Sequence, residues 1–477
     1  MSRRATAGVM KEVQRTVRSD RSAAGTWLIA LLAASFALRL AFVATAPSAL
    51  AGDAGHYDLL ARAILDRGEF PSAYRSPGYP AFVAAVYAAA GRSPSAVYLL
   101  QAVISTAGVY FVYRLGLELL GRGRWRAALV AAACIGANPE IAAYCAMLLR
   151  ESLTISLTAL AAWLAVRTWF GASRAAWPLG VALAALVYVR AEACLLVLPL
   201  LAVHVLRRPR VNLRAGLIAI ALPLILAGPW MACCAAFRGY GGMQTAFDSC
   251  LFSRVWYLSP QGRVAPELRA RIVEVVAASK LSDQEVRRYM IPPRLVEQLP
   301  YGDVRAEAAL YRQLGAIARE NVAGQPAAYA ADCVNHLRAT LGGYWLFWWP
   351  DYWNAPPFAR NIRDGQWVYV AVKVGNRMVW PAVMIALTAI ATAGLWVRRD
   401  RAAGPLALLV LGALAAIALV CLCVCGDPRL RLAYDPVLYI AAVAGWRMAA
   451  AARPVQTGWR RLRELLSHRP AGVVQET

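Results

Sequence analysis

The chain is poor in charge and in lysine. Only 16% of its 477 residues are charged and 60% are hydrophobic, whereas soluble domains carry about 25% charged and about 45–50% apolar residues. This composition excludes a soluble multidomain enzyme, a disordered chain and a small disulfide-stapled secreted domain. Lysine occurs only at Lys11, Lys280 and Lys373, so arginine supplies nearly all of the formal net charge of +24.

Several ligand-binding motifs are also missing. The chain has no Walker A loop, no GxGxxG sequence after a strand and no GxSxG nucleophile motif. Its basic clusters are short turns beside apolar stretches rather than one continuous face, so nucleic-acid binding is not predicted. The sequence therefore offers no nucleotide site.

What the chain does have is a series of apolar stretches near the length of a bilayer span, typical of an all-α polytopic membrane protein. We count 10 spans, and about 10–12 with re-entrant pieces. The predicted spans cover residues 27–47, 95–120, 127–137, 152–170, 177–206 (two short helices in a hairpin), 216–237, 378–397, 404–425 and 432–448.

The arginines predict the sidedness of these spans, because short loops rich in Lys and Arg stay cytoplasmic. We expect both termini in the cytoplasm, insertion in an inner membrane, and outer segments at 51–94, 238–375 and 426–431. The expected organisation is a basic N-terminus (1–26), an N-terminal transmembrane module (27–237), an extracytoplasmic helical region (238–336), a C-terminal transmembrane module (337–452) and a cytoplasmic tail (453–477).

The first outer loop carries the most distinctive polar residues. Asp53, His56 and Tyr57 would share one face of a short helix by their i, i+3, i+4 spacing. A carboxylate at the membrane surface can act as a general base. The alternative is that Asp53 only caps the helix N-terminus, a position that Asp favours.

Three more charged groups fall on the outer side or at membrane depth. Glu151 begins a span, where the helix dipole or Arg150 could hold it structurally. Arg190 and Glu192 flank the hairpin turn and could simply pair with each other, although ionisable groups at membrane depth are costly and often functional.

Arg429 and Arg431 precede the last span. Two guanidiniums there suit a phosphate, and interfacial anchoring is the alternative. Arg39 lies within the first span, where we expect it to have a buried structural partner.

The long outer region contains helical periodicity at 266–279 and 303–321. An apolar and aromatic run follows at 329–349 and includes Tyr344, Trp345, Trp348 and Trp349. Aromatic residues favour membrane interfaces. The functional alternative is a platform for a sugar ring or a lipid chain.

Metal binding is weakly indicated. The thiols of Cys421, Cys423 and Cys425 fit buried packing better than a metal motif. Cys250 and Cys333 both face the oxidising side and could pair. A divalent metal held by Asp53, Glu151 and either His56 or His336 is an alternative that stays open, although the spacing of these residues does not indicate it.

The order of these features resembles a known superfamily. A late Arg39 in the first span, Asp53 and Tyr57 in the first outer loop, and Arg75-Ser76-Pro77-Gly78-Tyr79-Pro80 come first. Glu151, the 190–192 turn, the 309–329 stretch and the 429–431 segment follow in order. Over about residues 27–450 the chain resembles the GT-C superfamily of polyprenyl-phosphate-sugar-dependent glycosyltransferases. The most similar branch is protein O-mannosyltransferase-like and lipid A aminoarabinose transferase-like.

The resemblance implies a GT-C-like helical bundle and an inverting transfer from a polyprenyl-phosphate sugar to a lipid, glycan or protein acceptor. Asp53 and Glu151 would be catalytic. The substrate-binding candidates are His56, Tyr57, Arg75, Tyr79, Arg190, Glu192, Arg429 and Arg431. Two alternatives are a lipid-linked sugar flippase or transporter, and an O-antigen ligase or polymerase that uses a diphosphate-linked donor and an outer histidine such as His336.

Overall fold

The computed structural model describes residues 3–46, 50, 52–207, 209–256, 266–278, 291–342, 362–397, 401–423 and 428–451. Within these ranges every regular element is a helix and none is a strand, which confirms the predicted all-α class. The aromatic run at 344–349 lies outside the described residues.

The N-terminal half contains the helices α1 (Arg3–Ala44), α2 (Asp53–Arg67), α3 (Gly78–Ala90), α4 (Pro94–Leu120), α5 (Trp125–Gly136), α6 (Pro139–Ala143), α7 (Glu151–Trp169), α8 (Ala176–Arg190), α9 (Leu198–Arg207) and α10 (Pro209–Cys233). The helix η4 (Ala191–Leu196) joins α8 to α9, and the π-helical turn η5 (Cys234–Arg238) ends α10.

The C-terminal half contains α11 (Ala246–Val255), α12 (Pro266–Ala278), α14 (Val304–Gly324), α15 (Pro326–Leu341), α18 (Trp367–Val374), α19 (Trp380–Val397), α20 (Ala403–Cys423), α21 (Pro428–Arg431) and α22 (Asp435–Ala450). The helices predicted at 266–279 and 303–321 are confirmed as α12 and α14. The latter begins where the Asp303 side chain accepts a hydrogen bond from the Ala306 N–H group.

The chain is a multi-pass membrane protein. Among the described residues, five helices are long and apolar enough to cross a bilayer, and a sixth span results if α5 and α6, bent by 52°, are taken together. These five are Ser22–Ala44, Pro94–Leu120, Ser173–Leu196, Leu213–Arg238 and Ala403–Leu422. Other predicted spans coincide with shorter helices such as α9, α19 and α22, so the total of ten stays a prediction.

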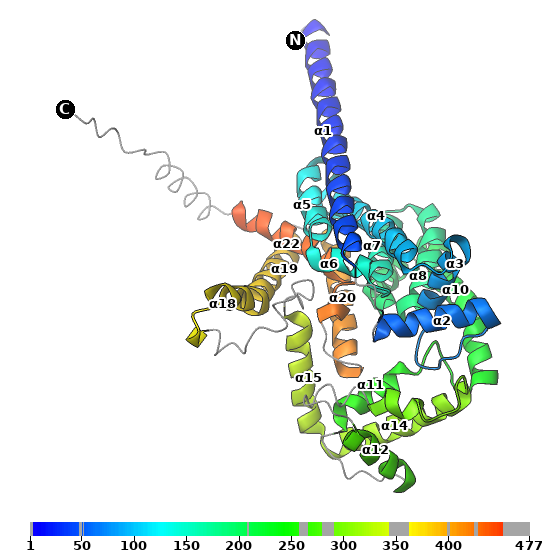
Figure 1. Ribbon diagram of the computed structural model, residues 1–477. Helices are drawn as coiled ribbons and strands as arrows, with labels where there is room; N and C mark the ends of the chain where they lie inside the picture. The colour runs from blue at the N-terminus through cyan, green and yellow to red at the C-terminus, as the bar shows by residue number, and fades with distance from the viewer. Residues whose placement is uncertain are drawn as a thin grey trace.

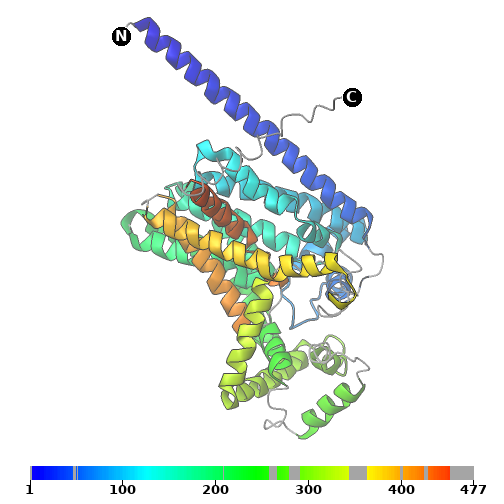
Figure 2. The ribbon, with the colours of Figure 1, turned by 90° about the vertical axis from the view of Figure 1, so that its left-hand side faces the viewer.

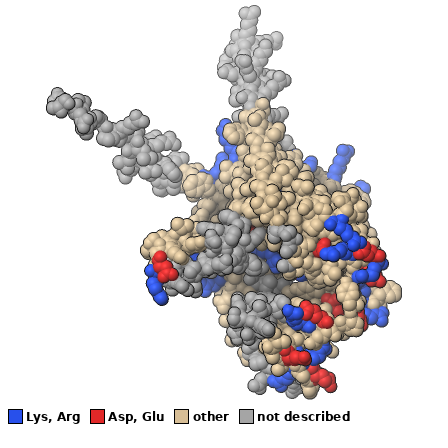
Figure 3. Space-filling model, in the orientation of Figure 1, with Lys and Arg blue, Asp and Glu red and all other residues tan. Residues whose placement is uncertain are grey.

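The helices form a large bundle and a smaller group beside it (Figure 1). Viewed from the side, α1 extends well beyond the bundle, and α15 and α20 run toward the smaller group of α11, α12 and α14 (Figure 2). The smaller group has its own apolar cluster, including Phe252, Ile272 and Leu314. Its visible face carries mixed acidic and basic side chains, whereas much of the visible bundle is uncharged (Figure 3). This contrast fits a bundle in lipid and a group outside it.

Arg39 ties three helices of the bundle together. Its side chain is fully buried, and its Nε atom donates to the Ser105 hydroxyl at 2.8 Å. Its Nη1 atom donates to the carbonyl oxygens of Ser35 at 2.9 Å and Gly136 at 3.0 Å. The expectation of a buried structural partner for this cation is confirmed.

Small residues set the closest helix contacts, as in other membrane bundles. At Gly445 in α22, a Cβ atom would collide with the carbonyl group of Leu387 in α19. We expect Gly445→Ala to destabilise the bundle by about 1–3 kcal/mol, because the backbone of α19 must move. Thermal unfolding in detergent would measure the loss. Gly228→Ala in α10, where nothing lies within 4 Å, is the control and should not lower the melting temperature; equal loss in both variants would contradict the packing argument.

Candidate active site

The site begins at the first residue of α2. Gly52 occupies the N-cap position with φ of 56°, a left-handed conformation that favours glycine. The carboxylate of Asp53 pairs with the guanidinium of Arg75, and its Oδ2 accepts from Nη1 of Arg429 at 3.2 Å. Because Gly52 holds the N-cap position and the Asp53 carboxylate faces two arginines, capping does not account for this residue.

Arg75 is held in place by the residues around it. Its guanidinium carbon lies 4.9 Å from the ring centroid of Tyr57 and 4.7 Å from that of Tyr74. Its Nη1 donates to the Tyr57 hydroxyl and its Nε donates to Nδ1 of His56, each at 3.5 Å. Asp53, His56 and Tyr57 thus converge on Arg75, which confirms that they share one face of α2.

Six charged side chains form a row that we call the charge chain. Arg429 links the two carboxylates, because its Nη1 contacts Asp53 and its Nε lies 3.7 Å from Oε1 of Glu151. Arg190 lies 4.0 Å from Oε1 of Glu151 and 3.1 Å from Oε1 of Glu192. In spatial order the members are Arg75, Asp53, Arg429, Glu151, Arg190 and Glu192. With three guanidiniums and three carboxylates, its formal charges cancel.

Exposure differs along the charge chain. The side chains of Asp53 and Arg429 are 35% and 28% exposed, whereas those of Glu151 and Arg190 are 3% and 2% exposed. A ligand that approaches from solvent therefore meets Asp53 and Arg429 first. Glu151 and Arg190 form the buried part of the row, and Glu192 at its end is 23% exposed.

The charges around α2 shift its titrating groups. Burial works to raise the pKa of Asp53, but the guanidiniums of Arg75 and Arg429 outweigh it and hold that pKa well below its ordinary value. Burial, together with the Arg75 cation, lowers the pKa of His56 to about 4. At neutral pH Asp53 is ionised and His56 is uncharged.

Glu151 sits in the first turn of α7, where the helix dipole favours a carboxylate. The Nη1 atom of Arg150 donates to the carbonyl oxygen of Val189 at 3.2 Å, and Arg150 also interacts electrostatically with Glu151. Glu151 Oε2 is buried and accepts no hydrogen bond from the described residues. The predicted pair of Arg190 and Glu192 does form, and Arg190 faces Glu151 as well.

Two of the predicted substrate-binding residues, Tyr79 and Arg431, are buried and bond to neighbouring helices. Tyr79 is 1% exposed, its hydroxyl donates to Oε1 of Gln101 at 2.7 Å, and its ring packs edge-on against Tyr57. Arg431 is also buried; it pairs with Asp435 at 2.9 Å and donates to the carbonyl oxygen of Thr340 at 3.1 Å. Both side chains thus support neighbouring helices, and their assignment to substrate binding stays a prediction.

Two residues that support the site were not predicted from the sequence. The Tyr74 ring lies against the guanidinium of Arg75. The only sequence signal for this contact was that Tyr74 directly precedes Arg75. Gln101, fully buried in α4, bonds Tyr79 and donates to the carbonyl oxygens of Cys145 at 3.1 Å and Met147 at 2.8 Å. A polar side chain inside an apolar span is a recognisable signal for such a role.

The histidines do not assemble a metal site with the carboxylates. His56 faces the Arg75 cation, and His336 pairs with Asp332 at 3.4 Å, apart from the charge chain. No group of three His, Cys, Asp or Glu side chains suited to a metal occurs in the described ranges. A divalent cation at the charge chain would also lie among three guanidiniums, which repel it. The residues present therefore do not fit a divalent metal.

Asp332 belongs to a separate ionic group in the outer region. It accepts a hydrogen bond from Nη2 of Arg254 at 2.8 Å. Although burial opposes ionisation, hydrogen bonds from His336 and Arg254 lower the pKa of Asp332 to about 2. Nearby, Cys333 has a free thiol, as has Cys250, so the disulfide between them that the sequence left open is not formed.

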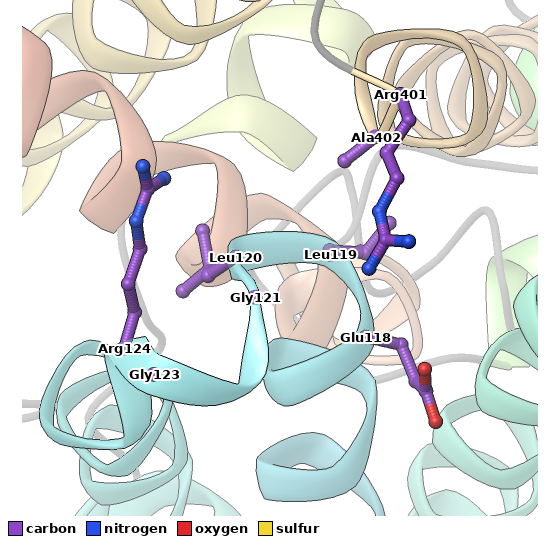
Figure 4. A pocket seen from close by; sticks show the side chains of 8 residues that line it. All are labelled: Glu118, Leu119, Leu120, Gly121, Gly123, Arg124, Arg401 and Ala402. Carbon is purple, nitrogen blue, oxygen red and sulfur yellow. The ribbon is translucent and has the colours of Figure 1, made fainter. Parts of the chain in front are cut away.

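A pocket of about 240 Å³ lies at the opposite end of α4 from Gln101. It is lined by residues that include Glu118, Arg124 and Arg401, from the end of α4, the turn that follows it and the start of α20 (Figure 4). None of the charge chain contributes to it. The pocket therefore belongs to the arginine-rich side of the bundle rather than to the candidate active site.

Comparisons with known proteins give a match to one family over part of the chain. Residues 74–232 match the model of a family described as dolichyl-phosphate-mannose-protein mannosyltransferase. The matched stretch includes Arg75, Glu151, Arg190 and Glu192. No curated protein sequence matches the chain significantly.

Among solved structures, the chain is similar to the crystal structure of ArnT from Cupriavidus metallidurans bound to undecaprenyl phosphate. The identity is 13%, the match covers 89% of this chain and 79% of that chain, and the TM-score is 0.38. The family match covers residues 74–232, about a third of the chain, and it lies on an all-helical, multi-pass fold that carries the charge chain.

Proposed function

We propose that this protein transfers a sugar from a polyprenyl phosphate to an acceptor, with inversion at the anomeric carbon. The acceptor hydroxyl or amine attacks that carbon, the bond from the carbon to the phosphate oxygen breaks, and the polyprenyl phosphate leaves with the bonding electrons. Asp53 takes the proton of the acceptor. The observation that carries the proposal is the partly exposed Asp53 carboxylate in direct contact with Arg75 and Arg429.

The arginines suit the leaving group. The donor is a phosphodiester with one negative charge, and the product is a phosphomonoester that carries about −1.5 to −2 near neutral pH. Negative charge therefore grows on the phosphate as the sugar departs. Arg429 is the most exposed arginine of the charge chain and can engage phosphate oxygens in a bidentate manner. Fixed cations at a site of developing charge lower the barrier.

The charge chain also explains how Asp53 becomes basic only when donor is present. Asp53 contacts two guanidiniums, and a carboxylate with a strongly lowered pKa is a weak base. An arriving phosphate competes with Asp53 and Glu151 for Arg429. When Arg429 turns to the phosphate, Asp53 loses one of its two cations and its pKa rises toward the ordinary range. The Asp53 carboxylate thus becomes a stronger base only when donor is bound, which limits unproductive proton transfer.

The remaining residues of the site orient Arg75, Asp53 and Arg429 in this proposal. Tyr57 and His56 orient Arg75, and Arg75 in turn orients Asp53. Glu151 and Arg190 form the buried part of the charge chain, which positions Arg429 before donor binds. Among the described residues nothing donates a hydrogen bond to Oε2 of Glu151, and we propose that this atom accepts one from a sugar or acceptor hydroxyl.

We propose that the site lies on the extracytoplasmic side of an inner membrane, with both termini in the cytoplasm. The distribution of arginine along the sequence supports this placement, because short segments rich in arginine, such as 122–126 and 207–214, stay cytoplasmic. The pocket beside Arg124 and Arg401 would then face the cytoplasm. The acceptor would be a lipid, glycan or protein of the cell envelope.

A donor panel tests the reaction class. Purified protein in nanodiscs is supplied with an envelope extract as acceptor source and with one sugar carried on polyprenyl phosphate, polyprenyl diphosphate or a nucleotide. We expect transfer only from the monophosphate, because the protein has no nucleotide motif and presents a carboxylate beside guanidiniums. Transfer from the diphosphate alone would favour a ligase, and transfer from the nucleotide sugar would overturn the proposal.

A further inference from the structure

The loop that carries Arg75 is held by residues of the outer helical region. Ala73, two residues before Arg75, is fully buried. Its N–H group donates to Oε2 of Glu307 in α14 at 2.8 Å, and its carbonyl oxygen accepts from both the N–H group and the hydroxyl of Thr245, at 2.8 and 2.9 Å. Both backbone polar groups of Ala73 are thus bound by elements far away in sequence.

The neighbouring residues of the loop are bound in the same way. Nη2 of Arg238 donates to the carbonyl oxygens of Phe70 at 2.7 Å and Ser72 at 2.6 Å. On the other side of Arg75, the Ser76 hydroxyl donates to Oε1 of Gln244 at 2.9 Å. We call Arg238, Gln244, Thr245 and Glu307 the outer clamp.

The clamp is a buried contact rather than a surface association. Ala73, Cys234, Tyr240 and Ala308 form one small apolar cluster around it. Glu307 itself is only 8% exposed, and a buried carboxylate is costly unless it is hydrogen-bonded. Backbone groups that are hydrogen-bonded on both sides inside such a cluster have little freedom to move.

We propose that the outer clamp is the positioning device of the active site: it fixes the 70–76 loop so that Arg75 meets Asp53 in one orientation. Glu307 and Thr245 are positioning residues, since they touch neither donor nor Asp53 and act through the peptide of Ala73. This inference rests on the proposed function for its kinetic consequences, whereas its structural consequences do not depend on any substrate.

The test compares Glu307→Ala with Glu307→Gln. Alanine leaves the Ala73 N–H group without its acceptor, whereas the glutamine carbonyl can still accept it. For Glu307→Ala we expect kcat to fall roughly 10- to 100-fold with little change in the KM for donor, because a misplaced base slows the chemical step. We expect Glu307→Gln to restore most of the wild-type kcat. A Gln variant as impaired as the Ala variant would overturn the proposal.

Coupling to Arg75 separates positioning from general destabilisation. In an Arg75→Ala background, Glu307→Ala should cause no further loss of kcat, because the group that it positions is gone. Fully additive losses would overturn the proposal. Glu297→Ala is the control, since this exposed residue of the same region pairs with Arg294 alone in the described contacts. The kcat of this variant should equal that of the wild type.

Hydrogen exchange gives a readout without substrate. The Ala73 amide should exchange about 10-fold faster or more in Glu307→Ala than in the wild type, and unchanged exchange would overturn the clamp. Thr245→Val, which removes one of the two bonds to the Ala73 carbonyl, tests the same point should Glu307→Ala not fold. If the wild type transfers no sugar from any donor, the proposed function fails, and the exchange data still decide on the clamp.

Discussion

Replacing Asp53 with asparagine is expected to lower sugar transfer by about 10²–10⁴-fold, the usual contribution of a positioned general base. Asparagine has nearly the same shape and can still accept a hydrogen bond from Arg75, but it cannot take a proton from the acceptor. The variant should still bind the donor, and more tightly than the wild type. The reason is that the charge chain changes from three cations and three anions to one excess cation, which a phosphate can neutralise.

The matched control for this variant is Asp66→Asn. Asp66 belongs to the same helix, is exposed and pairs only with Arg92 in the described contacts, so its loss should leave turnover unchanged. Initial rates of transfer and a binding isotherm with polyprenyl phosphate measure the two effects separately. Turnover by Asp53→Asn at the wild-type rate would remove Asp53 from the mechanism.

Loss of Arg429 is expected to have the second largest effect. Arg429→Ala removes the cation assigned to the leaving phosphate, and removal of a comparable donor to a developing oxyanion costs about 10²–10³ in kcat. Donor affinity should fall as well. Arg429→Lys should recover only part of the activity, because an ammonium group cannot contact two phosphate oxygens as a planar guanidinium does.

The pH profile of Arg429→Ala provides a second signature. Activity requires ionised Asp53, so it is lost as the pH falls through the pKa of that carboxyl. Arg75 and Arg429 both lower this pKa against the effect of burial. Without Arg429 the pKa rises, and the acid limb of kcat/KM should move to higher pH. Arg294→Ala, at an exposed arginine, should keep the wild-type profile; an unshifted acid limb in Arg429→Ala would contradict the assigned contact.

Local features of the site could be predicted from the sequence because they depend on helix periodicity. Asp53, His56 and Tyr57 had to share a face once the segment was taken as a helix, and they do converge on Arg75. The alternation of apolar spans and arginine turns likewise predicted the helical membrane fold. In each case the residues concerned lie only a few positions apart, so a single sequence is enough to show the pattern.

The long-range pairings could not be predicted in this way. Asp53 and Arg429 are separated by 376 positions, and no local pattern specifies their contact. Arg429 and Arg431 looked equivalent, but residues two apart on a helix do not face the same side. On α21 Arg429 therefore turns to Asp53 and Arg431 turns to Asp435. The hydrogen bond from the Ala73 N–H group to Glu307 could not be predicted for another reason, because its donor is a backbone group rather than a distinctive side chain.

The most direct test of sugar transfer with Asp53 as the base is to compare the amounts of the two products that the purified protein forms. Donor carrying a labelled sugar on polyprenyl phosphate is incubated with protein in nanodiscs and an envelope acceptor fraction, and both free polyprenyl phosphate and labelled acceptor are quantified. The account predicts equal amounts of the two products with the wild type and neither with Asp53→Asn. Sugar that stays attached to its lipid under all conditions, while the same protein in vesicles moves the intact donor across the bilayer, would contradict it and indicate a flippase.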